Sequence, residues 1–254
     1  MLFLSFLLWK RGEKLKNFTG KVQNINKIAS NAYELKISSE LAEAHSGQFI
    51  SISVPNKTFH RPFSIADFDK DKKITTVLFK LKGEGTNYLA NLKTNDNIEF
   101  LAPLGNKFNL INKNSLLVGA GIGIAPMLFL KKELDESDIK NYLISGFRTN
   151  DEVIPGSDEN VIGGSVLDNL NQIVKEKNIE VIYSCGPKVV LKEIANIAKN
   201  NKIISYIALE KVMACSIGVC RGCAIKLNKN GKTVRASVCK DGPVFRGDEV
   251  IWED

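Results

Sequence analysis

The fold of this 254-residue chain is decided by the stretch Leu116-Leu-Val-Gly119-Ala-Gly121-Ile-Gly123-Ile-Ala-Pro126. Its three leading apolar residues predict a short buried strand, and residues 125–134 predict the helix that follows. The glycines between them would let a backbone approach a pyrophosphate, and the helix N-terminus offers N–H groups to an anion. Pro126 fits the first helical turn, where its missing N–H is not needed. Because the spacing departs from the usual G-x-G-x-x-G, a plain tight turn is the alternative to a nucleotide loop.

Strands and helices alternate downstream of this stretch. Residues 142–144, 179–183 and 203–209 predict strands, and residues 166–175 and 189–199 predict helices. This alternation is typical of βαβ units on a parallel sheet.

A second candidate site follows one of these strands at Ser184-Cys185-Gly186-Pro187. Ligands of open α/β sheets lie at the carboxyl ends of the strands, so Cys185 could face a nicotinamide ring. The alternative is a small buried thiol that only fills the end of the strand.

The region before the decisive stretch has a different character. Short segments rich in β-branched and aromatic residues, such as residues 22–28, 33–37 and 74–80, predict closely spaced strands. In Ile50-Ser51-Ile52-Ser53-Val54 the strict alternation predicts a half-buried strand. Many short strands with little helix predict a small antiparallel barrel.

Two motifs of the predicted barrel carry polar chemistry. Arg61-Pro62-Phe63-Ser64 places a cation, an aromatic ring and a hydroxyl at the start of a strand. These groups would suit the pyrophosphate, the ring face and the polar edge of a flavin, although a plain barrel rim is the alternative. Gly83-Glu-Gly85-Thr86 precedes a short helix predicted at residues 87–92, and it is a second candidate phosphate cradle.

The strongest signal is a cluster of four cysteines near the end of the sequence. Cys215, Cys220 and Cys223 have the spacing C-x4-C-x2-C, and Cys239 follows sixteen positions later. This is the plant-type spacing of a [2Fe–2S] site. A structural zinc site, which usually takes paired C-x2-C clips, and four unligated thiols are the alternatives. An odd total of five cysteines, clustered in this way, does not resemble a disulfide framework and favours a reducing compartment.

Composition excludes several other classes of protein. Apolar residues make up 44% and charged residues 25%, as in globular proteins. The formal net charge is +7, but seven basic and two acidic residues lie within residues 1–36, so the excess is mostly a basic N-terminal segment. No aromatic-interleaved basic stripe suggests nucleic-acid binding. With only two histidines and no evident pair of catalytic carboxylates, hydrolytic catalysis has little support.

An apolar run opens the chain at residues 1–9. It is too short to be a transmembrane segment and lacks the features of a signal peptide. We expect an extension, or an element that packs on a neighbour, with a weak membrane-surface anchor as the alternative.

Taken in order, Arg-Pro-Phe-Ser, Gly-Thr, the glycine-rich stretch, Ser-Cys-Gly-Pro and the cysteines resemble the ferredoxin-reductase-like flavoproteins. Within that superfamily, two segments are similar to the electron-transfer subunits of NAD-linked (type B) dihydroorotate dehydrogenase. They are Leu209-Glu-Lys-Val-Met-Ala-Cys-Ser-Ile-Gly-Val-Cys-Arg-Gly-Cys223 and Val238-Cys-Lys-Asp-Gly-Pro-Val-Phe245. The resemblance covers residues 18–254.

This resemblance implies three cofactor sites that relay electrons, with no catalytic side chain. It implies that FAD is bound by Arg61, Pro62, Phe63, Ser64, Leu78, Phe79, Lys80, Gly85 and Thr86. It implies that NAD is bound by Gly119, Gly121, Gly123, Pro126, Cys185, Gly186 and Pro187. It implies that a [2Fe–2S] cluster is held by Cys215, Cys220, Cys223 and Cys239. Phe63 stands where many members of the wider superfamily carry Tyr.

The same resemblance implies four parts of the chain. They are a leader at residues 1–16, an FAD-binding β-barrel at 17–108, an NAD-binding α/β domain at 109–209 and a [2Fe–2S] module at 210–254. It also implies a function in de novo pyrimidine (UMP) biosynthesis, in the cytoplasm. A separate FMN-containing subunit would oxidise dihydroorotate, and the electrons would pass through the cluster and FAD to NAD+ in a heterotetramer of two plus two subunits.

A partner is required because this chain is too short to hold a dihydroorotate-binding barrel of roughly 250 residues as well. FAD would lie between the other two centres, since a cluster exchanges single electrons and NAD+ accepts a hydride.

Two other functions stay open. One is an NAD(P)H-ferredoxin or sulfide-type reductase subunit of the same superfamily, and the other is a zinc-stabilised, non-enzymatic binding module. The choice between NAD and NADP is also open, because Arg148 could accept a 2′-phosphate while Asp151 and Glu152 lie close to it in the sequence.

Overall fold

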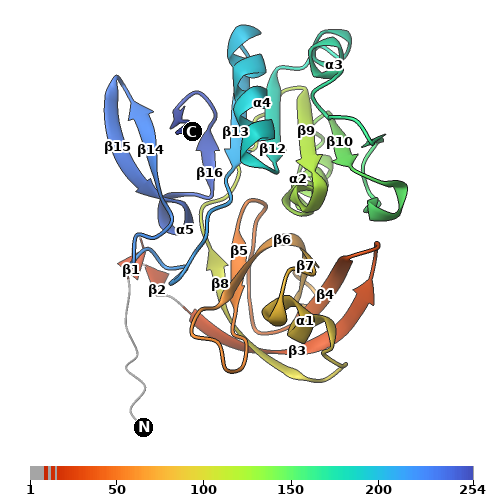
Figure 1. Cartoon of the computed structure of the whole chain (residues 1–254), viewed down its shortest axis with the longest axis vertical. Helices are drawn as coiled ribbons and strands as arrows, with labels where there is room; N and C mark the ends of the chain where they lie inside the picture. The colour runs from red at the N-terminus through yellow and green to blue at the C-terminus, as the bar shows by residue number, and fades with distance from the viewer. Residues whose placement is uncertain (1–8, 11–12, 15, 254) are drawn as a thin grey trace.

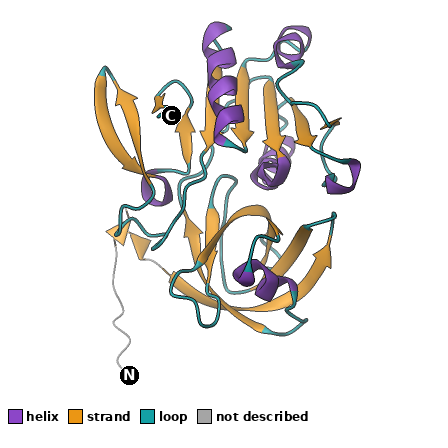
Figure 2. Cartoon of the chain, in the orientation of Figure 1, coloured by secondary structure: helices purple, strands orange, loops and turns teal. Residues whose placement is uncertain are grey.

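The structure is a computed structural model that describes residues 9–10, 13–14 and 16–253. It contains a closed β-barrel, a six-stranded sheet and a small three-stranded sheet (Figure 1). Figure 2 shows helices on both faces of the six-stranded sheet. The predicted fold class, a barrel followed by a parallel-sheet domain and a cysteine module, is confirmed. Within the described residues no helix is long and apolar enough to cross a membrane.

Most of the apolar N-terminal run lies outside the described residues. What the structure describes of the predicted leader is a short antiparallel pair, β1 (Trp9–Lys10) and β2 (Glu13–Lys14), and the first residue of the barrel. The expectations for residues 1–8 therefore stay predictions.

The barrel consists of six antiparallel strands in the order β3-β4-β7-β6-β5-β8. Their bounds are β3 Lys16–Lys27, β4 Ala32–Ser38, β5 Phe49–Ile52, β6 Arg61–Asp69, β7 Ile74–Lys80 and β8 Asn97–Leu104. Helix α1 (Glu84–Ala90) lies between β7 and β8 in sequence, and its Leu89 is buried in the barrel core. This helix begins three residues before the predicted start, so Gly85 and Thr86 belong to its first turn.

Strand β5 differs from its prediction, because it is buried on both faces. Ile50 and Ile52 point into the barrel core, as their alternation predicts. Phe49 packs outside the barrel with Cys223 and Cys239, and Ser51 contacts Ser216. The covering segment lies about 165 positions further along the chain. Local alternation carries no information about such a distant partner, so the prediction of a half-buried strand is wrong.

The six-stranded sheet has the order β11-β10-β9-β12-β13-β16. Its strands are β9 Ser115–Ala120, β10 Asn141–Phe147, β11 Glu159–Ile162, β12 Val181–Cys185, β13 Ile204–Ala208 and β16 Val244–Arg246. All neighbours are parallel except β16, which pairs antiparallel with β13. The sequence pattern did not predict β11, an edge strand in which half of the residues are polar. The strand order reverses between β9 and β12, where ligands of such sheets bind.

Helix α2 (Ile124–Glu136) lies between the sheet and the barrel and joins the two. Its Phe129 belongs to the barrel core, whereas Leu130 and Leu134 pack on the sheet. Polar contacts reinforce this junction: the Lys132 ammonium lies 2.7 Å from the Asp67 carboxylate, and the Glu133 carboxylate lies 3.0 Å from His45. The barrel and the sheet therefore share one helix.

The other face of the sheet carries α3 (Leu170–Glu176) and α4 (Lys188–Asn200). Two short 3-10 turns, η1 (Gly121–Gly123) and η2 (Asn150–Glu152), follow β9 and β10.

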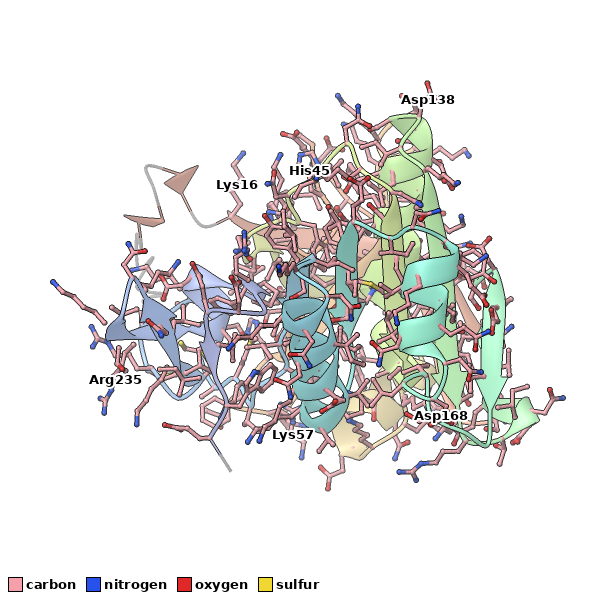
Figure 3. The ribbon with its side chains drawn as sticks, turned by 90° about the horizontal axis from the view of Figure 1, so that it is seen from above. Lys16, His45, Lys57, Asp138, Asp168 and Arg235 are labelled. Atoms are coloured by element: carbon pink, nitrogen blue, oxygen red, sulfur yellow. The ribbon has the colours of Figure 1, made fainter. Side chains whose placement is uncertain are left out.

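The cysteine segment packs on both larger parts. Its sheet has the order β15-β14-β17, with β14 Ala224–Lys229, β15 Lys232–Ser237 and β17 Val250–Ile251, and α5 (Val238–Asp241) follows β15. Seen from above in Figure 3, the β14–β15 hairpin with Arg235 projects on the side opposite Asp168. Strand β16 returns to the central sheet, and the Asn106 side chain pairs with the Val244 backbone, accepting and donating at 2.9 and 2.8 Å.

Candidate functional site

A cavity of about 230 Å³ lies where the barrel, the sheet and the cysteine segment meet. It brings together residues predicted for two different cofactors. From the flavin prediction come Pro62, Phe63, Ser64, Leu78, Phe79, Lys80 and Thr86, and from the NAD prediction come Pro126 and Cys185. The predicted flavin and NAD motifs, which are separate in sequence, therefore line one cavity.

The barrel side of the cavity is aromatic and apolar. The ring centres of Phe63 and Phe79 are 5.6 Å apart, and Tyr33 stacks on the far side of Phe79 at 5.8 Å. Lys80, at the end of β7, places its ammonium 3.1 Å from the Glu152 carboxylate in η2. Both side chains are largely buried, so this ion pair joins the barrel to the sheet beside the cavity.

Arg61 and Gly85 are not among the residues that line the cavity, although their neighbours Pro62 and Thr86 are. A Cβ added at Gly85 would lie 2.8 Å from the Arg61 Nε, so the glycine leaves room for the guanidinium. The Thr86 hydroxyl accepts hydrogen bonds from the N–H groups of Lys82 and Gly83 at 2.9 and 3.2 Å. The predicted phosphate cradle is thus a defined turn with a cation beside it.

On the sheet side, the glycine-rich stretch contacts the end of β12. A Cβ added at Gly123 would lie 2.3 Å from the Cys185 carbonyl oxygen, and one at Gly119 would lie 2.7 Å from the Ile124 Cα. Gly121 has φ +58° and no atom within 4 Å of its Cβ position. Gly119 and Gly123 therefore allow close backbone packing, while Gly121 faces open space, as a nucleotide loop requires.

The remaining residues of the NAD prediction lie between the end of β12 and the start of α4. Cys185 is 3% exposed, and burial raises the pKa of its thiol, which stays neutral. Gly186 and Pro187 border a neighbouring cavity of about 260 Å³ rather than the first one. The structure therefore brings Cys185 and Pro126 together and places Gly186 and Pro187 just beside them.

The four clustered cysteines form two pairs. The sulfur atoms of Cys223 and Cys239 are 3.3 Å apart. The sulfur of Cys215 accepts the Cys220 N–H at 3.3 Å, so these two residues also lie together. In a [2Fe–2S] cluster each iron takes two of the four thiolates, which this pairing fits. Among the described residues no group of three or more His, Cys, Asp or Glu side chains is arranged to hold a single metal ion.

The two pairs differ in electrostatics. Burial raises the pKa of the Cys215 thiol, but N–H groups of Cys220, Ile217 and Val219 outweigh it and lower this pKa to about 7. Burial and the neighbouring Cys223 raise the pKa of Cys239 to about 12. The Cys215 thiol is therefore about half ionised at neutral pH, whereas the Cys239 thiol needs the charge of a metal to become thiolate.

Sequence reasoning missed part of the cavity wall. The missed residues are Phe49, Lys82, Ile122, Ala125, Leu209, Glu210, Lys211, Met213 and Pro243. Residues 209–213 follow β13, the parallel strand next to β12, so the rule on carboxyl ends of strands could have found them. Phe49 and Pro243 reach the cavity only through tertiary packing, for which the sequence holds no local signal.

Comparison with known proteins places this chain in a family. The iron–sulfur cluster binding domain of dihydroorotate dehydrogenase B matches residues 210–251. The chain is 35% identical over 244 residues to the dihydroorotate dehydrogenase B (NAD(+)) electron transfer subunit of Caldanaerobacter subterraneus, covering 91% of this chain and 97% of that one. The chain belongs to the dihydroorotate dehydrogenase B electron-transfer subunits. The resemblance carried by the motifs is thereby confirmed.

Other matches agree with this family. The electron transfer subunit of Fusobacterium nucleatum is 32% identical over 251 residues, covering 89% of this chain and 95% of that one. Among solved structures, an NADH-dependent reduced ferredoxin-NADP oxidoreductase superposes with a TM-score of 0.79 at 27% identity, covering 92% of this chain and 90% of that one. A ferredoxin NADP+ reductase from Neisseria gonorrhoeae has a TM-score of 0.61 at 15% identity, covering 73% and 91%, which shows the shared fold.

Proposed function

We propose that this dihydroorotate dehydrogenase B electron-transfer subunit passes electrons from a dihydroorotate-oxidising partner to NAD+, in pyrimidine biosynthesis. The observation that carries the proposal is the shared cavity. Its wall combines the aromatic barrel side, the glycine-loop helix and residues 209–213, which lead into the cysteine cluster. A group bound there would contact all three parts of the chain.

FAD, when bound in such a cavity, exchanges single electrons with an iron–sulfur cluster and a hydride with NAD. In our proposal Phe63, Leu78 and Phe79 hold the isoalloxazine ring through apolar contact. Ser64 and Lys80 offer a hydroxyl and an ammonium to its polar edge. Arg61, Pro62, Gly85 and Thr86 form the turn and the cation that would receive the pyrophosphate.

The nicotinamide nucleotide would bind on the sheet side of the same cavity. Its pyrophosphate would approach the backbone at Gly119, Gly121 and Gly123. The position of its ring would be lined by Pro126 and Cys185. Gly186 and Pro187 lead into α4 next to it. Because the Cys185 thiol is neutral and buried, its role is steric: it shapes the place where the ring lies and excludes water.

Cys215, Cys220, Cys223 and Cys239 would hold the [2Fe–2S] cluster. Phe49, Leu209 and Met213 pack in the same apolar cluster as Cys223 and Cys239, and all three also line the cavity. These three apolar side chains therefore connect Cys223 and Cys239 to the proposed flavin position. This short apolar path suits electron transfer.

The names of the relatives describe a subunit, and this supports a catalytic partner for this chain as well. We propose that the partner is an FMN-containing dihydroorotate dehydrogenase and that two copies of each chain assemble in the cytoplasm. The partner would dock where the cluster is most accessible, at the exposed Cys220.

A second candidate is an electron-transfer subunit of an NAD(P)H-dependent ferredoxin oxidoreductase. The TM-score of 0.79 to a protein of that kind favours it. The two candidates differ in the partner that delivers the electrons, so the choice of donor decides between them.

The test is to co-express this chain with a type B dihydroorotate-oxidising subunit and measure NADH formation from dihydroorotate. The complex should form NADH, whereas the partner alone should reduce only artificial dyes. Electron delivery from reduced ferredoxin, with none from dihydroorotate, would favour the second candidate. NADH formation by the partner alone would contradict the proposal.

A further inference from the structure

A buried pair of hydroxyls joins the barrel to the cysteine loop. Ser51 on β5 is 0% exposed, and Ser216, which directly follows Cys215, is 1% exposed. The Ser51 Oγ donates a hydrogen bond to the Ser216 Oγ at 2.9 Å, across 165 positions of sequence. A buried hydroxyl without a partner would be costly, so each serine depends on the other.

The conformation of Ser216 is unusual for its residue type. Its φ is +58°, in the left-handed region that glycine adopts without strain and that other L-residues rarely adopt. The same loop uses a glycine at position 218, where φ is +85°. A serine at position 216 is therefore less favourable for the backbone than a glycine, but it supplies a hydroxyl that a glycine lacks.

That hydroxyl has a hydrogen to give. Ser51 supplies its own hydrogen to the Ser216 oxygen, and within the described part of the chain the Ser216 hydroxyl donates to no other group. Its hydrogen is thus not committed to another described group, and it belongs to the residue next to Cys215, whose sulfur accepts the Cys220 N–H at 3.3 Å. Hydrogen bonds and dipoles aimed at the sulfurs of a cluster stabilise the added negative charge of its reduced form.

We propose that Ser51 and Ser216 are a positioning pair that fixes the cysteine loop against the barrel and raises the reduction potential of the cluster held there. The inference rests on the proposed function, because it requires a [2Fe–2S] cluster at these cysteines. Two aligned hydroxyl dipoles polarise each other, so the loss of either one weakens the effect of both. The same strand carries Phe49 in the cavity wall, so β5 positions both the cluster loop and the proposed flavin site.

The test uses four variants of the full chain. Ser216→Gly removes one hydroxyl while suiting the left-handed backbone, and Ser51→Ala removes the other. The double variant combines them, and Ser51→Thr restores a hydroxyl on a strand that accepts β-branched residues. Ser53→Ala is the matched control, because it removes a hydroxyl just past the end of β5, where the side chain is only half-buried.

The readout is the midpoint potential of the cluster, measured by an EPR-monitored redox titration, after iron and acid-labile sulfide show equal cluster content. We expect more negative potentials for Ser216→Gly and Ser51→Ala, and a double variant whose shift is smaller than the sum of the two. Ser51→Thr should return towards the wild-type value, and Ser53→Ala should match it.

Unchanged potentials in cluster-loaded variants, or shifts that add fully in the double variant, would overturn the pairing. A wild-type chain without iron and sulfide would instead defeat the proposed function itself, so the two failures are distinguishable. Thermal unfolding of the cluster-free variants completes the test. A loss of stability without any change in potential would make the pair merely structural and would also contradict the proposal.

Discussion

Single glycines at the sheet end set how closely two segments of this chain approach each other. Gly123 is the clearest case, because the backbone of Cys185 occupies the space that a side chain would need. The glycine-rich pattern was visible in the sequence, but its partner was not. Only the parallel pairing of β9 with β12 brings the two segments together.

We predict that Gly123→Ala impairs the use of NADH. The added methyl group would lie 2.3 Å from the Cys185 carbonyl oxygen, so one of the two segments must move. Such overpacking costs about 1–3 kcal/mol, and a displaced nicotinamide site should lower NADH–dye activity on the order of 100-fold. Val234→Ala is the control, since this side chain lies on β15, outside both proposed nucleotide sites. Equal effects of both substitutions on kcat/KM would contradict this account.

Cys220 is the most accessible of the four cluster cysteines. We predict that Cys220→Ser removes the cluster, seen as lost iron and acid-labile sulfide, and leaves FAD and NADH–dye activity largely intact. The reason is that the proposed flavin and nicotinamide contacts come from other parts of the chain. Cys185→Ala should behave in the opposite way, keeping iron and sulfide while changing the NADH reaction. Loss of the NADH–dye activity together with the cluster, in a folded and FAD-loaded Cys220→Ser variant, would be the contrary result.

At the scale of elements, β5 and α2 explain what the sequence pattern could and could not predict. Hydrophobic patterns located most barrel strands and α/β elements because the apolar residues that mark each element are local in sequence. It could not predict the second covered face of β5, nor the barrel contact of Phe129, because both depend on segments far away in sequence. The edge strand β11 was missed because half of its residues are polar.

We predict that α2 couples the stability of the barrel to that of the sheet. Phe129 is 4% exposed and lies in the barrel core, so Phe129→Ala should lower the free energy of unfolding by about 3–5 kcal/mol. Thermal unfolding of the chain should stay a single transition, since both parts lose the same contact. Phe59→Ala, at a side chain that is 52% exposed, should change stability by less than about 0.5 kcal/mol. Two separate transitions in Phe129→Ala would argue against the shared helix.

At the scale of the whole molecule, the order of motifs predicted the architecture and the family. Cysteine spacing was the most specific signal, because a cluster constrains four thiols at once, and residues 210–251 match the corresponding domain. The shared cavity was not predictable, since residues from three parts of the chain build it. The basic excess of the first 36 residues concerns a segment that the structure describes only in part.

The size of the complex tests the proposed assembly. Co-expressed with a type B partner, this 28.1 kDa chain should elute in a complex whose mass, by light scattering, equals two copies of each subunit. High salt should weaken the complex only partly if apolar contact near Cys220 contributes to the interface. A co-expressed chain that elutes alone at every concentration would contradict the proposed partnership.

The central claim, that this chain carries a flavin and an iron–sulfur cluster in adjoining sites, is tested most directly by the composition of the protein itself. The measurement is anaerobic purification of the full chain followed by assay of flavin, iron, acid-labile sulfide and zinc. We predict FAD with two irons and two sulfides per chain, as one [2Fe–2S] cluster requires. Zinc without flavin would contradict it and support the zinc-stabilised binding module instead.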